Sequence, residues 1–205
     1  MADCNENAAC QEYSRPKDCA DDTDSDDEPS FQEKLKNLLS SHAIKSAFEK
    51  TPIKFVPEGI IHELITEDQI KAALDIQAAT VEEDELVGFT RMRAKKIFAI
   101  AIHVQPNKIV AIMKWWKKNN MDDGDLPITF RPGWKRQWLS EFCEMQWMFL
   151  APVFSTTQYN RNLDDAHILP FISKRSDSGR GSFGVVSQYV IQRKHLDPVS
   201  MRFPF

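Results

Sequence analysis

The stretch Trp138-Leu-Ser-Glu-Phe-Cys-Glu-Met-Gln-Trp-Met-Phe149 decides the fold class of the larger part of this chain. Its apolar residues Trp138, Phe142, Met145 and Phe149 recur at near-helical spacing, which is typical of a helix with one buried face. The same aromatic stripe could line a ligand pocket, but a helix that packs in a core is the commoner use. We therefore predict a core helix here.

Four more helices are expected upstream of this one. Apolar residues recur every three to five positions from near residue 30 to near residue 48. Thr66 and Gln69 form a capping-box pattern that opens a short second helix. We expect a third helix over 82–104, because its acids precede its bases, and a fourth after Asn107, which can cap it. Residues 31–155 should thus form one helical domain of about five helices.

Trp115 and Trp116 stand beside three lysines, a combination that can indicate a stacking platform for nucleic-acid bases. Adjacent residues on a helix point about 100° apart. We therefore expect one of the two tryptophans in the core and the other at its edge. Outside the first thirty residues, twenty-four basic side chains oppose twenty acidic ones. This excess is too small to predict a nucleic-acid partner.

Residues 1–30 differ from the rest, with ten acidic side chains against two basic ones and almost no aliphatic residues. Such a segment cannot bury enough apolar surface to offset the entropy of ordering, so we expect a disordered acidic tail. Thr23 and Ser25 precede acidic residues and are candidate phosphorylation sites for an acid-directed kinase. An unmodified, solubilising tail is the alternative.

The composition indicates an intracellular protein, cytoplasmic or nuclear, without a membrane partner. The chain shows no signal-peptide pattern, and its longest apolar run, Ile97 to Ile102, is far shorter than the roughly 20 residues of a membrane span. The four cysteines lack paired or ligand-like spacing, and the five histidines lack a zinc-binding pattern. Asp164, Asp165 and His167 lie close together, but a solvated turn is a better interpretation than an acid–base group.

Beyond Pro152 the pattern changes to short β-favouring runs at 168–172 and 185–191. The chain is therefore expected to be α+β: mainly α, followed by a short antiparallel β-hairpin. Before the second run, and overlapping its first two residues, stands Gly179-Arg-Gly-Ser-Phe-Gly-Val-Val186, which matches the G-x-G-x-x-G-x-V pattern that covers ATP phosphates in protein kinases. In a dinucleotide-binding fold the glycines would open a helix, whereas here β-favouring residues follow them.

Two segments extend this resemblance, namely 142–154 and Ala166-His-Ile-Leu-Pro-Phe-Ile172. They are similar to the region that precedes the kinase domain in a family of fungal protein kinases. The resemblance implies that 156–205 is a linker and a partial kinase N-lobe, with strands at 168–178 and 185–193. It also implies an ATP-covering loop, with Mg²⁺ in a full-length form, made of these residues: Gly179, Gly181, Ser182, Phe183, Gly184 and Val186.

The chain departs from the family pattern after this loop. The sequence has no phosphate-pairing Lys on a third strand, no His-Arg-Asp and no Asp-Phe-Gly. Lys194 follows the second strand too closely to replace that Lys. We expect this chain to be a truncated kinase-like fragment that is inactive alone and binds ATP weakly. Its partner would be the remainder of a kinase domain or another protein. The alternative is a non-enzymatic helical interaction module.

Overall fold

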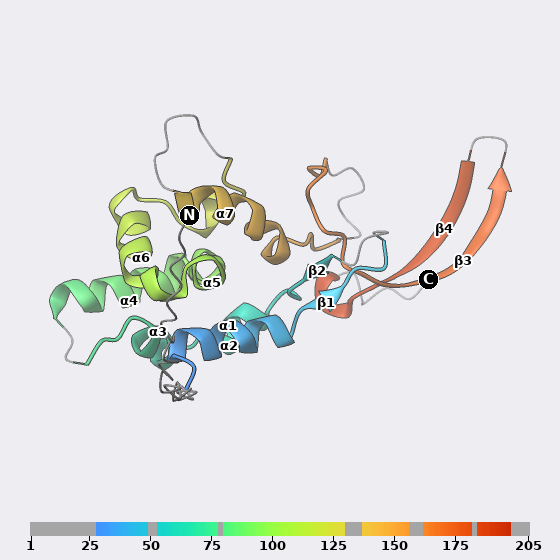
Figure 1. Cartoon of the computed structure of the whole chain (residues 1–205). Helices are drawn as coiled ribbons and strands as arrows, with labels where there is room; N and C mark the ends of the chain where they lie inside the picture. The colour runs from blue at the N-terminus through green and yellow to red at the C-terminus, as the bar shows by residue number, and fades with distance from the viewer. Residues whose placement is uncertain are drawn as a thin grey trace, which may run out of the picture.

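The computed structural model describes residues 28–48, 53–77, 80–129, 137–155, 162–181 and 184–197. Within them it shows seven α-helices that form a body, and a long β-hairpin that extends from one end of it (Figure 1). The α+β class predicted from the sequence is confirmed. The helices are α1 Phe31–Ser41, α2 Ile60–Leu64, α3 Glu67–Ala73, α4 Val81–Arg93, α5 Lys95–Val104, α6 Ile109–Lys118 and α7 Gln137–Met145.

Helix α5 lies at the centre of the body, with α1 and α7 on either side of it (Figure 1). Every residue from Ile97 to His103 is buried, so this part of α5 is covered on all sides rather than on one face. Trp116 and Phe142, both fully buried, bring α6 and α7 into the same core. This packing, rather than intrinsic helix propensity, supplies most of the stability of such short helices.

The first predicted helix is shorter than expected, because α1 ends at Ser41 instead of near residue 48. Ser41 Oγ donates to the carbonyl of Leu38 at 2.7 Å, and such side-chain bonds compete with the helical ladder. The chain then enters strand β1, Ile44–Lys45, which pairs antiparallel with β2, Lys54–Phe55. Phe55 is fully buried there. The strand pair therefore replaces the last helical turns.

The predicted helix over 82–104 is wrong in one respect, because two helices, α4 and α5, meet at Ala94. Ala94 has φ −138° and ψ 35°, outside the helical region, and is fully buried. The new N-terminus at α5 is capped from a distance by Asp123, whose two carboxylate oxygens accept the N–H groups of Lys96 and Ile97, each at 2.9 Å. The second helix therefore begins where a residue from outside the segment, Asp123, caps it.

The capping predictions had mixed outcomes. The capping box of Thr66 and Gln69 is present at α3, and a second one joins Thr80 to Glu83 at α4. The predicted cap at Asn107 is wrong: Asn107 lies in the 3₁₀ turn Pro106–Lys108, and α6 starts after it without a side-chain cap. Proline favours such an N-terminal turn because its φ is already near the helical value.

The aromatic stripe that starts in α7 and ends in the 3₁₀ turn after it lies in the core, as predicted. Phe142 and Phe149 are buried, and Trp138 packs edge-on against Trp116 at 5.9 Å between ring centroids. Of the tryptophan pair, Trp116 is fully buried and Trp115 is partly exposed at the core edge, which confirms the prediction of one inside and one outside. The helix tightens into a 3₁₀ turn, Gln146–Phe149, before the chain leaves the body.

Candidate functional site

The three motif glycines lie near the end of the hairpin, in the last residues of strand β3 (Phe171–Gly181) and at the start of strand β4 (Gly184–Ile191). The strands are antiparallel, and their register pairs Gly181 with Gly184 and Gly179 with Val186. All three motif glycines therefore stand at the turn or beside it. A backbone without Cβ atoms allows N–H groups to approach a phosphate closely.

Strands flank the glycines on both sides, as the kinase-like interpretation requires. A dinucleotide-binding fold would place a helix directly after the last glycine, whereas β4 begins at Gly184 itself. The strand boundaries differ by a few residues from the predicted 168–178 and 185–193. Val186 is 66% exposed. Ser182 and Phe183 lie outside the described residues, so their predicted roles stay predictions.

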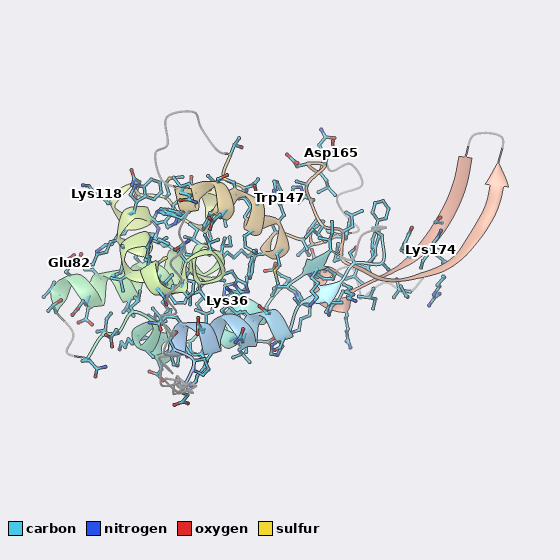
Figure 2. All side chains as sticks on the ribbon, in the orientation of Figure 1. Lys36, Glu82, Lys118, Trp147, Asp165 and Lys174 are labelled. Atoms are coloured by element: carbon cyan, nitrogen blue, oxygen red, sulfur yellow. The ribbon has the colours of Figure 1, made fainter. Side chains whose placement is uncertain are left out.

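The hairpin is irregular along its length. Its register shifts three times: between Phe171 and Ser173, between Lys174 and Asp177, and between Asp177 and Gly179. Extra residues of this kind bend a strand and increase its twist. Figure 2 shows Lys174 on the hairpin, well outside the packed side chains of the helical body. The glycines at the far end of the hairpin therefore lie away from the core.

Aromatic rings hold the base of the hairpin to the body. Phe171 lies between Tyr189 and Phe154, with stacked rings at centroid distances of 5.0 and 6.2 Å. Phe48 meets the edge of Phe171 at 5.8 Å. The amide of Ala47 donates to the carbonyl of Phe171 at 2.6 Å. The four rings form a cluster, named here the neck, that links the β1–β2 pair to the hairpin.

Beyond β4 the chain turns back onto the body through the 3₁₀ turn Arg193–His195. Lys194, which was not expected to replace the kinase lysine, forms an ion pair with Glu63 of α2 at 2.6 Å. This pair holds it at the opposite end of β4 from the glycine tip. His195 is buried at 1% exposure and makes hydrogen bonds to two distant parts of the chain.

No sequence pattern pointed to a role for His195. Its partners are the carbonyl of Pro152 and the amide of Glu58, which lie 43 and 137 residues away. A histidine that follows a strand is otherwise indistinguishable from a surface residue. His103 is also buried, in the last turn of α5, and its pKa is lowered by burial.

A cavity of about 530 Å³ opens beside α7, and most of its wall is apolar. Met145, Trp147 and Met148 form one side of it, and Ile168 another. Glu141 and Glu144 stand at the same cavity. It lies on the helical body and does not include the glycine tip.

The remaining sequence candidates have structural roles. Asp164 Oδ1 accepts the amide of Ala166, and the Asp164 amide donates to His167 Nδ1, so these residues form a turn, as predicted. Asp165 is exposed and labelled in Figure 2. On α6, Lys114 and Lys117 form ion pairs with Glu82 and Glu85 of α4, at 3.1 and 2.8 Å.

Three further observations concern the described part of the chain. It contains no group of three or more side chains that could ligate a metal ion. No helix in it has the length and apolar character needed to cross a membrane. Thr23 and Ser25 lie outside the described residues, so their phosphorylation stays a prediction.

The fold and the site together define a helical body that carries a glycine-tipped β-hairpin. Comparison of the chain with family models, with curated proteins and with solved structures finds no match. The resemblance to protein kinases therefore rests on the glycine motif, the two neighbouring segments and the order of the elements.

Proposed function

We propose that this chain is the N-terminal part of a protein kinase-like polypeptide, in which the hairpin tip covers the phosphates of ATP. The observation that carries the proposal is the position of Gly179, Gly181 and Gly184 at the turn of an antiparallel hairpin. Peptide N–H groups at such a turn can donate to phosphate oxygens. Val186, opposite Gly179 in the register, would lie where the adenine ring packs.

The hairpin alone supplies one wall of a nucleotide site. Phosphoryl transfer depends on a lysine, a metal-binding aspartate and a catalytic aspartate, and residues 1–205 contain none of the motifs that carry them. These groups would come from further residues of a longer polypeptide or from a second chain. We therefore expect ATP binding by residues 1–205 to be weak, and phosphotransfer to need the missing parts.

The test is an NMR titration of the ¹⁵N-labelled chain with ATP and Mg²⁺. We expect small saturable shifts at the amides of 179–186, and a loss of at least about tenfold in affinity, about 1.4 kcal/mol, in Gly181→Val and Gly184→Val. Gly88→Ala is the matched control, because a Cβ at this helical glycine meets no atom within 4 Å. Shifts confined to the helical body, or unchanged binding in both valine variants, would contradict the proposal.

A non-enzymatic interaction module is the second candidate. The hairpin forms a sheet of only two strands, and Ile172 and Val186 on it are 43% and 66% exposed. A two-stranded sheet offers edges to which another strand can pair. For this candidate, Gly181→Val leaves partner binding intact, whereas Ile172→Lys weakens it. Sedimentation of the two variants with a strand-forming partner distinguishes the two functions.

A further inference from the structure

The segment 192–197, named here the clasp, fastens the base of the hairpin to the body. The amide of Gln192 donates to the carbonyl of Pro170 at 2.9 Å. The amide of Phe154 donates to the carbonyl of His195 at 2.8 Å, and the amide of Asp197 donates back to Phe154 at 2.9 Å. These three backbone hydrogen bonds hold the clasp on the body, and one of them ends at the carbonyl of His195.

The ring of His195 makes two hydrogen bonds whose directions are fixed. Its Nδ1 lies 3.0 Å from the carbonyl oxygen of Pro152, which can only accept. Its Nε2 lies 3.0 Å from the amide nitrogen of Glu58, which can only donate. The neutral ring with its proton on Nδ1 satisfies both partners. The ring also packs edge-on against buried Phe55, at 5.3 Å between centroids.

The charged groups around the ring pair with one another. Glu58 Oε2 lies 3.3 Å from Lys96 Nζ, and Lys194 Nζ lies 2.6 Å from Glu63 Oε1. Burial lowers the pKa of His195, and the nearby Lys96 acts in the same direction, while the bond to Pro152 and the charge of Glu58 oppose them. A cleft of about 610 Å³, lined by Lys194 and Leu196 among others, lies beside the clasp.

We propose that His195 makes the clasp a pH-sensitive switch, which holds the hairpin base on the helical body while the ring is neutral and releases it when the ring is protonated. A proton on Nε2 would face the N–H of Glu58, so that two donors would meet and the bond would be lost. A buried, charged ring with one N–H that lacks an acceptor is costly. Opening lets the protonated ring reach water.

The direction of the pH effect follows from proton linkage. The ring prefers the neutral form when the clasp is closed, whereas in the open state it titrates near the ordinary pKa of about 6.5. The contribution of His195 to closing is therefore complete above about pH 6.5 and falls as the pH drops below it. One linked proton changes the ratio of open to closed clasp by up to about tenfold per pH unit.

His103 is a matched control within the same chain, because it is buried but has an adaptable partner. Its Nδ1 lies 2.9 Å from the carbonyl of Ala99, and its Nε2 lies 3.0 Å from Ser40 Oγ. Ser40 Oγ also lies 2.9 Å from the carbonyl of Lys36. The hydroxyl can turn its proton to Lys36 and accept from a protonated ring. A fixed amide such as that of Glu58 cannot reverse in this way.

The experiment measures hydrogen exchange at the amides of Phe154 and Asp197 in the whole chain, at about pH 7.5 and about pH 5.5, corrected for intrinsic exchange rates. We expect protection to fall about tenfold between the two. In His195→Gln, whose side-chain oxygen can still accept from Glu58 but does not titrate, protection should be the same at both pH values, whatever its level. His103→Gln should behave like the unchanged protein.

Two results would overturn the proposal: equal protection of the unchanged protein at both pH values, or an unaltered pH dependence in His195→Gln. A second measurement does not depend on the variant's folding. The ring ¹⁵N shifts of His195 should show the Nδ1–H tautomer at high pH, and its protonation should coincide with the loss of protection at Phe154. Protonation without that loss would also refute the switch.

Discussion

Asp123 caps a helix that begins far from it in sequence: its Oδ1 accepts the backbone N–H of Ile97 at 2.9 Å. Helix α5 has no capping side chain of its own. The carboxylate lies at the positive end of the helix dipole, where negative charge is favourable. Burial raises the pKa of Asp123, while its bonds to the Lys96 and Ile97 amides act in the opposite direction.

Replacing this cap should destabilise the body. We expect Asp123→Ala to lower the free energy of unfolding by about 1–2 kcal/mol, as for other caps, because two N–H groups lose their acceptor. Urea unfolding followed by circular dichroism measures the difference. Asp165→Ala is the control: Asp165 is exposed, and its replacement should stay within about 0.5 kcal/mol. Equal effects of the two variants would contradict this role of Asp123.

Gln146 should be as sensitive, because its buried amide satisfies the backbone of another segment. Its Oε1 accepts the amide of Ile128 at 2.7 Å, and its Nε2 donates to the carbonyls of Ile128 and Cys143. Gln146→Leu should cost roughly 2–4 kcal/mol, since buried groups of Ile128 lose their partners. The exposed Gln77→Leu should change stability little. A loss below about 0.5 kcal/mol in Gln146→Leu would show that water or relaxation replaces the amide.

Trp116 should tolerate one substitution well. Its ring is fully buried, and among the described residues its Nε1 has no hydrogen-bond partner. Trp116→Phe removes that buried donor and keeps an aromatic ring against Phe142, so we expect a cost below about 1.5 kcal/mol. Trp116→Ala should cost about 3–5 kcal/mol through the cavity it leaves. Thermal unfolding of both variants checks the difference, and similar losses would indicate a hidden partner of the indole.

The pair of Arg93 and Asp122 should be visible in a titration. Arg93 Nη2 lies 2.6 Å from Asp122 Oδ2, and this bond, with a smaller one from the amide of Gly124, holds the pKa of Asp122 below its ordinary value of 3.8. The contribution of the pair to stability is therefore present above that value and lost as the pH falls through the lowered pKa. Arg93→Gln should raise the pKa of Asp122, as ¹³C NMR can measure. Arg91→Gln, whose charge pairs with Glu67 instead, should leave it unchanged.

Local patterns in the sequence predicted the elements that local interactions make. The capping box of Thr66 and Gln69 lies within four residues, and the burial of Phe142 and Phe149 follows from helical spacing. The hairpin around Gly181 was predicted for the same reason, since β-favouring residues flank a glycine turn. Each of these signals is complete within a short window of the chain.

Two of the features that sequence reasoning missed depend on distant partners. The break at Ala94 is stabilised by Asp123, 26 and 27 residues beyond the amides it caps, so the segment itself looks like one continuous helix. His195 lies in the core because Glu58 and Pro152 meet it there. Asn107 fits a cap pattern, but the adjacent Pro106 begins a 3₁₀ turn instead. Tertiary packing decides the break at Ala94 and the burial of His195, whereas the outcome at Asn107 depends on the neighbouring proline.

The neck formed by Phe48, Phe154, Phe171 and Tyr189 gives the hairpin the mechanics of a lever. Strand β3 spans 11 residues, so at about 3.3 Å per residue its tip lies roughly 33 Å from this pivot. A rotation of about 10° at the rings would displace the tip by about 6 Å. A small displacement of the rings at this pivot would thus move the glycines by more than the width of a phosphate group.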